Sequence, residues 1–315
     1  MIWQLLIGLV LMLVGGEALV RGAVALAERL GVSPLVIGVT LIGFGTSAPE
    51  LATCIDAALR GAPGIAVGNV IGSNIANVLL ILAVGALLHP IAAKRRALGR
   101  DGSVLLASAL VCTVIVVSGH LGRWLAAALV IGLVIYLIVT TLDDRRQTAE
   151  RNDGTEAKAG GRPSTIPLNL FLIAFGLGAV LLGADLLVKG AIDLAGLLGV
   201  SDAVIGLTVV AIGTSLPELA TAVIASLKRE GELAFGNVVG SNIFNTLGIF
   251  GATALAQPID IPDDVAGFDI WIMLAATTML LVFAITNWRV SRPEGAVLLI
   301  GYIAYIGLHA GVIGT

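Results

Sequence analysis

Gly43-Phe-Gly-Thr-Ser-Ala-Pro-Glu50 and Ala211-Ile-Gly-Thr-Ser-Leu-Pro-Glu218 are two copies of one segment, and the rest of the chain is arranged around them. Each copy places two hydroxyls, a proline and a carboxylate in otherwise apolar sequence. Proline lacks an N–H and its ring crowds the carbonyl four residues earlier, so each copy predicts a broken helix. A carboxylate in such surroundings is costly, which favours a functional role for Glu50 and Glu218.

The composition is that of a membrane protein. Hydrophobic residues make up 57% of the 315 residues and charged residues 12%, and the mean hydropathy is +1.02. These values exclude an ordinary soluble domain. The apolar runs are long and continuous, whereas a β-barrel requires alternation. The fold class that we predict is therefore an all-α membrane protein.

Ten transmembrane helices fit the length of the chain, because each span needs roughly 20–25 residues. The only long polar segment is 143–166, which we interpret as a flexible linker between two halves. The predicted spans are residues 2–28, 35–59, 64–88, 102–118, 122–142, 167–196, 203–227, 232–256, 266–286 and 294–313.

The second half repeats the first in one register. Glu218 follows Glu50 by 168 residues, and Ser241 and Asn245 follow Ser73 and Asn77 by the same number. A constant offset over some seventy residues indicates a duplication. We therefore divide the chain into a first five-helix repeat (1–142), the linker (143–166) and a second five-helix repeat (167–315).

The basic residues predict the orientation of the chain. With both termini outside, the inside loops and the linker hold fourteen Lys and Arg residues and the outside loops hold only Arg60 and Arg123. This distribution obeys the positive-inside rule and makes the 143–166 loop cytoplasmic. Five spans per half mean that the two copies enter the membrane from opposite sides, as in the inverted repeats of secondary transporters.

The polar residues of the two repeats share helix faces. Thr46 and Glu50 are four residues apart, and Ser73 and Asn77 have the same spacing on the next span. The second half repeats this arrangement, so the midplane gains carboxylate, hydroxyl, amide and freed carbonyl oxygens. Such hard ligands suit calcium, sodium, magnesium or manganese. The two negative charges of Glu50 and Glu218 can be neutralised by one divalent cation, by monovalent cations or by protons. An exchanger requires a site that accepts such different ions in turn.

Other features have structural interpretations. Glu17 with Arg21, and Asp185 with Lys189, are spaced four apart, which predicts ion pairs on one helix face. The Gly-x-x-x-Gly patterns at 68–72 and 236–240 are typical of close helix packing.

The two repeats resemble the α-repeats of the calcium/cation antiporter superfamily, the sodium/calcium exchangers, and especially its compact bacterial branch. The resemblance rests on Gly-Thr-Ser-Ala-Pro-Glu50 with Gly-Asn-Val-Ile-Gly-Ser-Asn-Ile-Ala-Asn77, and on the matching motifs that end at Glu218 and Asn245. It covers essentially the whole chain and implies ten helices, midplane ion sites and alternating access by sliding of the first helix of each half. The ion ligands that it implies are side chains of Thr46, Ser47, Glu50, Ser73, Asn77, Thr214, Ser215, Glu218 and Ser241, with the backbone carbonyls of Gly43 and Ala211. We add Asn245 to the candidate ligands because it repeats Asn77 at the constant offset.

The resemblance implies a function as well. We expect an antiporter that exchanges sodium for calcium across a prokaryotic inner (plasma) membrane, with no cofactor, no nucleic acid and no obligate protein partner. Asparagine at position 245, where potassium-dependent members carry aspartate, implies no potassium requirement. The alternative is a proton/calcium antiporter that uses the same carboxylates.

Two other classes are disfavoured by the sequence. Matched inverted halves argue against a channel, which usually gathers symmetric subunits around a pore. The motifs contain no histidine base beside Thr46 or Thr214 and no nucleotide-binding loop, so the chain is not expected to be an enzyme.

Overall fold

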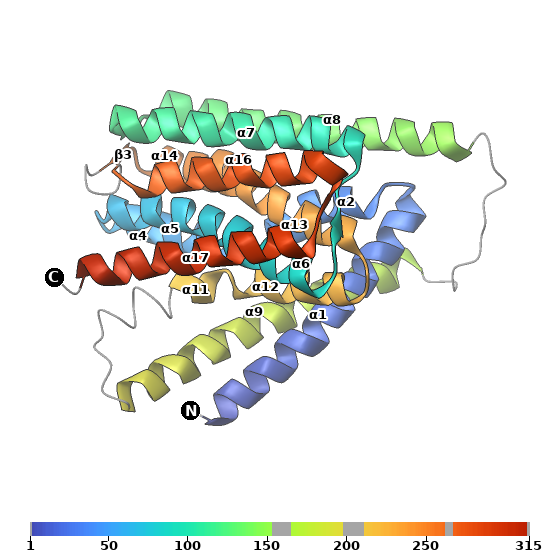
Figure 1. The fold of residues 1–315 in the computed structure, drawn as a ribbon, viewed down its shortest axis with the longest axis horizontal. Coiled ribbons are helices and arrows are strands. Elements are labelled where there is room, and N and C mark those ends of the chain that lie inside the picture. The colour runs from blue at the N-terminus through green and yellow to red at the C-terminus, as the bar shows by residue number, and fades with distance from the viewer. Residues whose placement is uncertain (1, 153–164, 198–210, 262–266, 314–315) are drawn as a thin grey trace.

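The computed structural model describes residues 2–152, 165–197, 211–261 and 267–313, and these residues are predominantly helical (Figure 1). The first-half elements are α1 (Ile2–Leu30), α2 (Pro34–Ile37), η1 (Gly38–Ile42), α3 (Gly43–Thr46), α4 (Ala48–Leu59), α5 (Pro63–Ala76), η2 (Asn77–Leu82), α6 (Ala83–Leu88), β1 (Ile91–Ala92), α7 (Arg95–Ser118), β2 (His120–Leu121) and α8 (Arg123–Asn152). The second-half elements are α9 (Ile166–Leu197), α11 (Ala211–Thr214), α12 (Leu216–Leu227), α13 (Gly231–Ile243), η4 (Phe244–Ile249), α14 (Phe250–Ala256), β3 (Ile259–Asp260), α16 (Asp269–Asn287), β4 (Arg289–Val290) and α17 (Arg292–Ile313).

Seven described helices are long and apolar enough to cross a membrane, and an eighth span arises if the bent pair Pro34–Thr46 and Ala48–Leu59 is counted as one. A helix also lies at the predicted tenth span, and α12 occupies part of the seventh. Since residues 198–210 lie outside the described part, the count of ten stays a prediction. The start of α1 and the end of α17 lie toward one end of the long helices, and the end of α8 lies toward the other (Figure 1).

Two details differ from the expectation of plain helices joined by loops. Short antiparallel strand pairs join helix ends, β1 with β4 and β2 with β3. Helix α8 continues to Asn152, so residues 143–152 of the expected linker are helical. A helix can extend past the apolar core because its backbone hydrogen bonds are internal, and polar side chains then face water.

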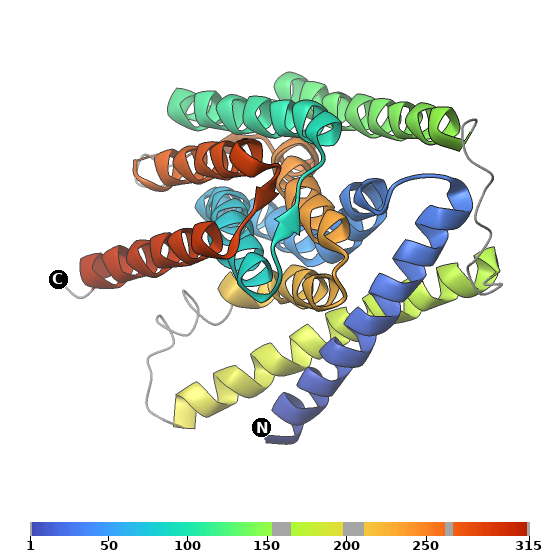
Figure 2. The ribbon, with the colours of Figure 1, turned by 45° about the vertical axis from the view of Figure 1, so that its right-hand side comes forward.

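Helices α1 and α9 run against each other beneath the rest of the bundle (Figure 2). A Cβ atom at Gly176 would lie 2.5 Å from the Leu19 nitrogen, and one at Gly183 would lie 2.7 Å from the Gly8 oxygen. Small residues permit this backbone-to-backbone approach. The glycines that face the other helix recur every seven residues on each helix: Gly8, Gly15 and Gly22 on α1, and Gly176, Gly183 and Gly190 on α9.

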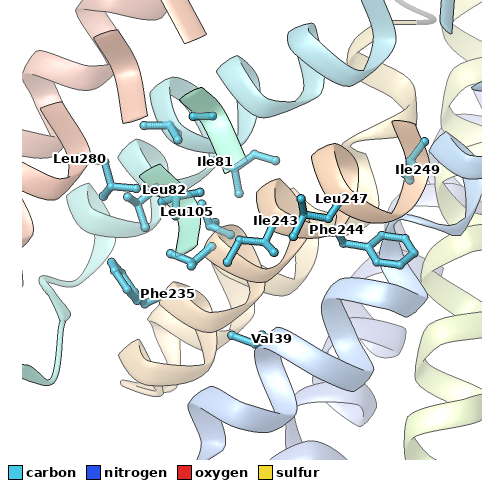
Figure 3. Packing of buried hydrophobic residues seen from close by; sticks show 14 of the residues in the cluster. Val39, Ile81, Leu82, Leu105, Phe235, Ile243, Phe244, Leu247, Ile249 and Leu280 are labelled. Carbon is cyan, nitrogen blue, oxygen red and sulfur yellow. The ribbon is translucent and has the colours of Figure 1, made fainter. Parts of the chain in front are cut away.

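The centre of the bundle is the packing of α13 on α2 and η1. A Cβ at Gly236 would lie 2.5 Å from the Leu35 oxygen, and one at Gly240 would lie 2.5 Å from the Val39 Cα. Figure 3 shows Val39 beside α13, with apolar side chains of η2, α13 and η4 filling the neighbouring space. The packing role predicted for the 236–240 glycines is confirmed, and it sets how closely the two halves meet. The same prediction is wrong for the 68–72 glycines, because no described atom lies within 4 Å of a Cβ added at Gly68 or Gly72.

Asp144 holds the start of the broken helix that carries Glu50. Its two carboxylate oxygens accept hydrogen bonds from the Ser33 backbone N–H, at 2.5 Å, and from the Ser33 hydroxyl, at 2.8 Å. Ser33 is the residue immediately before α2. The end of α8 is thereby attached to the segment that leads into the first repeat motif.

Replacing Asp144 with alanine should lower stability, because it removes both hydrogen bonds at a partly buried position. At roughly 0.5–1.5 kcal/mol for each bond, the expected loss is about 1–3 kcal/mol. A reduced melting temperature of the detergent-solubilised protein would show it. Arg145→Ala, which changes the exposed neighbouring residue, is the matched control and should have no effect. Equal melting temperatures for both variants would contradict the anchoring role.

Candidate functional site: a buried oxygen cluster between the two halves

Each repeat motif breaks its helix at the serine. Helix α3 ends at Thr46, Ser47 has φ −86° and ψ 10°, and α4 begins at Ala48 after a bend of 44°. In the second copy Ser215 has φ −91° and ψ 5° between α11 and α12. The breaks predicted from the prolines are confirmed. Each break presents the carbonyl end of a short helix, which carries negative partial charge, to the same region.

The two carboxylates lie in the first turn after each break and are almost completely buried. Glu50 is 2% exposed and Glu218 is 1% exposed. The Ser47 hydroxyl donates to Oε1 of Glu218 at 2.8 Å, and the Ser215 hydroxyl lies 3.5 Å from Oε1 of Glu50. Each serine therefore reaches the carboxylate of the other half, so neither copy forms the site alone.

The neighbouring helices bring four buried asparagines together. Asn77 Nδ2 donates to Oδ1 of Asn242 at 2.9 Å, and Asn245 Nδ2 donates to Oδ1 of Asn74 at 3.1 Å. These bonds also cross between the halves. Asn77 begins the π-helical segment η2, and Asn245 lies in the π-helical segment η4. Such segments inside α-helices occur frequently at functional sites.

Five side-chain oxygen atoms of the repeat motifs are buried without a hydrogen-bond partner. Buried polar atoms are normally paired, so an unpaired oxygen at a polar site is a candidate ligand for an ion or water. Among the described residues no salt bridge neutralises either carboxylate, and no three His, Cys, Asp or Glu side chains form a metal-binding group. The five atoms are Oε2 of Glu50, Oε2 of Glu218, Oδ1 of Asn77, Oδ1 of Asn245 and Oγ of Ser241.

The remaining predicted ligands are Thr46, Gly43, Ser73, Thr214 and Ala211, and their contacts differ from those of the carboxylates and asparagines. The Thr46 hydroxyl donates to the Ile42 carbonyl at 3.0 Å and lies 3.5 Å from Oδ1 of Asn237. The Gly43 carbonyl accepts the Ser47 N–H at 3.2 Å. Ser73 is buried. In the second half Thr214 interacts with Glu50, and Ala211 is the first residue of α11.

Asn74 and Asn242 were not among the predicted site residues, yet both are buried in the network. They are asparagines 168 residues apart, which is the offset of every other site pair. The repeat register was therefore the signal that could have found them. Their contacts were not deducible from it, because an offset does not tell which side chains meet.

The charged pairs that we interpreted as structural form as predicted. Arg21 pairs with Glu17, and Lys189 pairs with Asp185 at 2.7 Å. Glu17 also binds Lys228, at the end of α12. Asp185 lines a cavity of about 200 Å³ whose wall includes Thr214, so this pair lies next to the site.

Comparison with known proteins agrees with the fold and the motifs. The family described as sodium/calcium exchanger protein matches residues 1–142 and 168–310. The chain is 38% identical over 304 residues to the putative antiporter CaxA of Alkalimonas amylolytica, with 95% of each chain covered. It is 36% identical over 340 residues to the sodium/calcium exchanger MaX1 of Methanosarcina acetivorans, with 96% of each covered.

A solved structure of the sodium-calcium exchanger NCX_Mj superposes with a TM-score of 0.85 at 33% identity, covering 97% of each chain. Members of this family are transporters of sodium and calcium and not enzymes. The matches span nearly the whole chain, including both repeat motifs. The chain therefore belongs to the sodium/calcium exchanger family of membrane antiporters.

Proposed function

We propose that this chain exchanges sodium for calcium across a prokaryotic plasma membrane. The five unpartnered buried oxygens carry the proposal. They combine two carboxylates with neutral amide and hydroxyl oxygens, which is the ligand chemistry that calcium prefers. The names of the relatives MaX1 and NCX_Mj support sodium as the counter-ion.

In this proposal Glu50 and Glu218 hold calcium together, and sodium replaces it with the help of hydroxyls and carbonyls. Two carboxylates carry a charge of −2, which one calcium ion or two sodium ions neutralise. The other ligands would be Thr46, Ser47, Ser73, Asn77, Thr214, Ser215, Ser241 and Asn245, with the carbonyls of Gly43 and Ala211. The crossed serine contacts support a site shared by both halves.

We place this site at the midplane of ten helices, arranged as inverted repeats 1–142 and 167–315, with both termini outside and the 143–166 loop cytoplasmic. The family match in two blocks, which leaves out 143–167, supports the division. The crossed contacts between residues at matching positions support the pseudo-twofold relation. The glycine-lined contact of α1 with α9 supports movement of these two helices together during alternating access.

Purified protein in proteoliposomes should take up radiolabelled calcium when sodium is inside and not when choline is inside. The uptake should saturate with calcium, and adding or omitting potassium should not change it, since position 245 is asparagine. Calcium uptake should also be measured with an imposed pH gradient and no sodium, because this measurement distinguishes proton coupling from sodium coupling.

Uptake driven by protons and indifferent to sodium would replace sodium coupling with proton coupling through the same carboxylates. Calcium flux that needs no counter-ion and does not saturate would indicate a channel and contradict exchange.

A further inference from the structure

The four asparagines that hydrogen-bond to one another between the halves divide into two kinds. Asn77 and Asn245 each have a buried Oδ1 atom with no partner. Asn74 and Asn242 each use Oδ1 to accept a hydrogen bond from one of those two. We propose that Asn74 and Asn242 are positioning residues that aim the amide oxygens of Asn245 and Asn77 at the transported cation; this rests on the function proposed above.

The proposal follows from the asymmetry of the amide group. An asparagine amide carries an acceptor oxygen on one side and an NH₂ donor on the other. A cation is attracted by the oxygen and repelled by the NH₂ hydrogens. Because Asn77 Nδ2 is bound to Asn242 at 2.9 Å, its Oδ1 must face away from that bond. Asn245 is fixed in the same way by Asn74 at 3.1 Å.

The two positioning residues are themselves held. Asn74 Nδ2 donates to the Thr246 hydroxyl at 3.1 Å. Asn242 Nδ2 donates to the Asn74 backbone carbonyl at 3.3 Å. In this orientation their Oδ1 atoms accept the hydrogen bonds from Asn245 and Asn77.

Burial strongly favours these orientations of the four amide groups over rotated ones. All four asparagines are at most 3% exposed. Water is therefore not freely available to satisfy a rotated amide, and an unpaired buried polar group is costly. The network also ties α5 to α13 across the halves, so the two amide oxygens are set relative to each other and not only within one helix.

The test replaces Asn242 with leucine, which has a similar shape but cannot accept a hydrogen bond. With its amide no longer held, Asn77 should bind the cation less well, and the KM for calcium uptake should rise about fivefold to tenfold. The maximal rate should change much less, because the carboxylates remain. A variant that only damaged folding would lower the maximal rate through the amount of active protein.

A double-mutant cycle with Asn77→Ala separates positioning from direct binding. If Asn242 acts through Asn77, the double variant should have the same KM as Asn77→Ala alone. Effects that multiply would overturn the positioning role. A raised KM in Asn77→Ala with an unchanged KM in Asn242→Leu would also overturn it while the proposed function stands. An unchanged KM in Asn77→Ala would instead remove Asn77 from the proposed ion site.

The other half of the chain provides a second cycle. Asn74→Leu with Asn245→Ala should show the same non-additive pattern, since Asn74 accepts from Asn245. If Asn242→Leu gives no folded protein, this second cycle decides between the two outcomes.

Discussion

Replacing Glu50 or Glu218 with glutamine should abolish sodium-dependent calcium uptake in proteoliposomes. Both side chains are buried, and each has one oxygen that no described group binds. Glutamine keeps the size but removes one of the two charges that balance calcium. Losing a charged partner in a buried site costs roughly 2–5 kcal/mol, which corresponds to about a 30-fold or larger loss of affinity. Each single variant should therefore lack measurable uptake at calcium concentrations near the wild-type KM.

Asp56→Asn is the matched control for this experiment. Asp56 lies on the same helix as Glu50, but it is exposed and pairs with Arg60 at 2.7 Å. Its removal changes the net charge of the protein by the same amount without touching the buried cluster, so uptake should stay normal. Normal uptake in both glutamine variants would end the proposal that these carboxylates bind the ion.

Replacing Gly240 with alanine should weaken the packing between the two halves. The added Cβ would lie 2.5 Å from Val39 Cα and 2.7 Å from the Val39 oxygen, and these are backbone atoms that cannot rotate away. Overpacking of this kind costs about 1–3 kcal/mol. Helix segment η1 leads into the break at Ser47. Transport should therefore fall together with stability. Size-exclusion profiles and melting temperatures of the purified variant would measure the effect.

Gly132→Ala is the corresponding control in another spanning helix. No described atom lies within 4 Å of a Cβ added at Gly132. Alanine is intrinsically better than glycine in a helix by roughly 0.5–1 kcal/mol, so this variant should be unchanged or slightly more stable. A Gly240→Ala protein as stable and active as Gly132→Ala would show that the close contact is not required.

The relation between sequence and structure is clearest at the two repeat motifs. Proline and glutamate in apolar sequence predicted both helix breaks, because proline removes a backbone donor wherever it occurs. The constant offset predicted that Ser47 and Ser215 are equivalent. It did not predict that each one reaches the carboxylate of the other half, since that depends on how the halves face each other.

The asparagines show the same limit. Position along the helix selected Asn77 and Asn245 as candidate ligands, but Asn74 and Asn242 have the same residue type in the same motif. Only the packing of α5 against α13 distinguishes a residue with a free oxygen from one whose oxygen is used. Hydrogen bonding between distant segments is not encoded in local spacing.

What the sequence by itself determined is a membrane-spanning helical chain, its duplication, the helix breaks and the chemical type of the oxygens at the candidate site. These follow from hydropathy, repetition and backbone chemistry, which are local properties. The tertiary structure alone decided which oxygens are buried and remain unpaired, and how closely α13 approaches η1 through its glycines. Both depend on contacts between residues far apart in the chain, where steric fit and burial, and not local preference, select the arrangement.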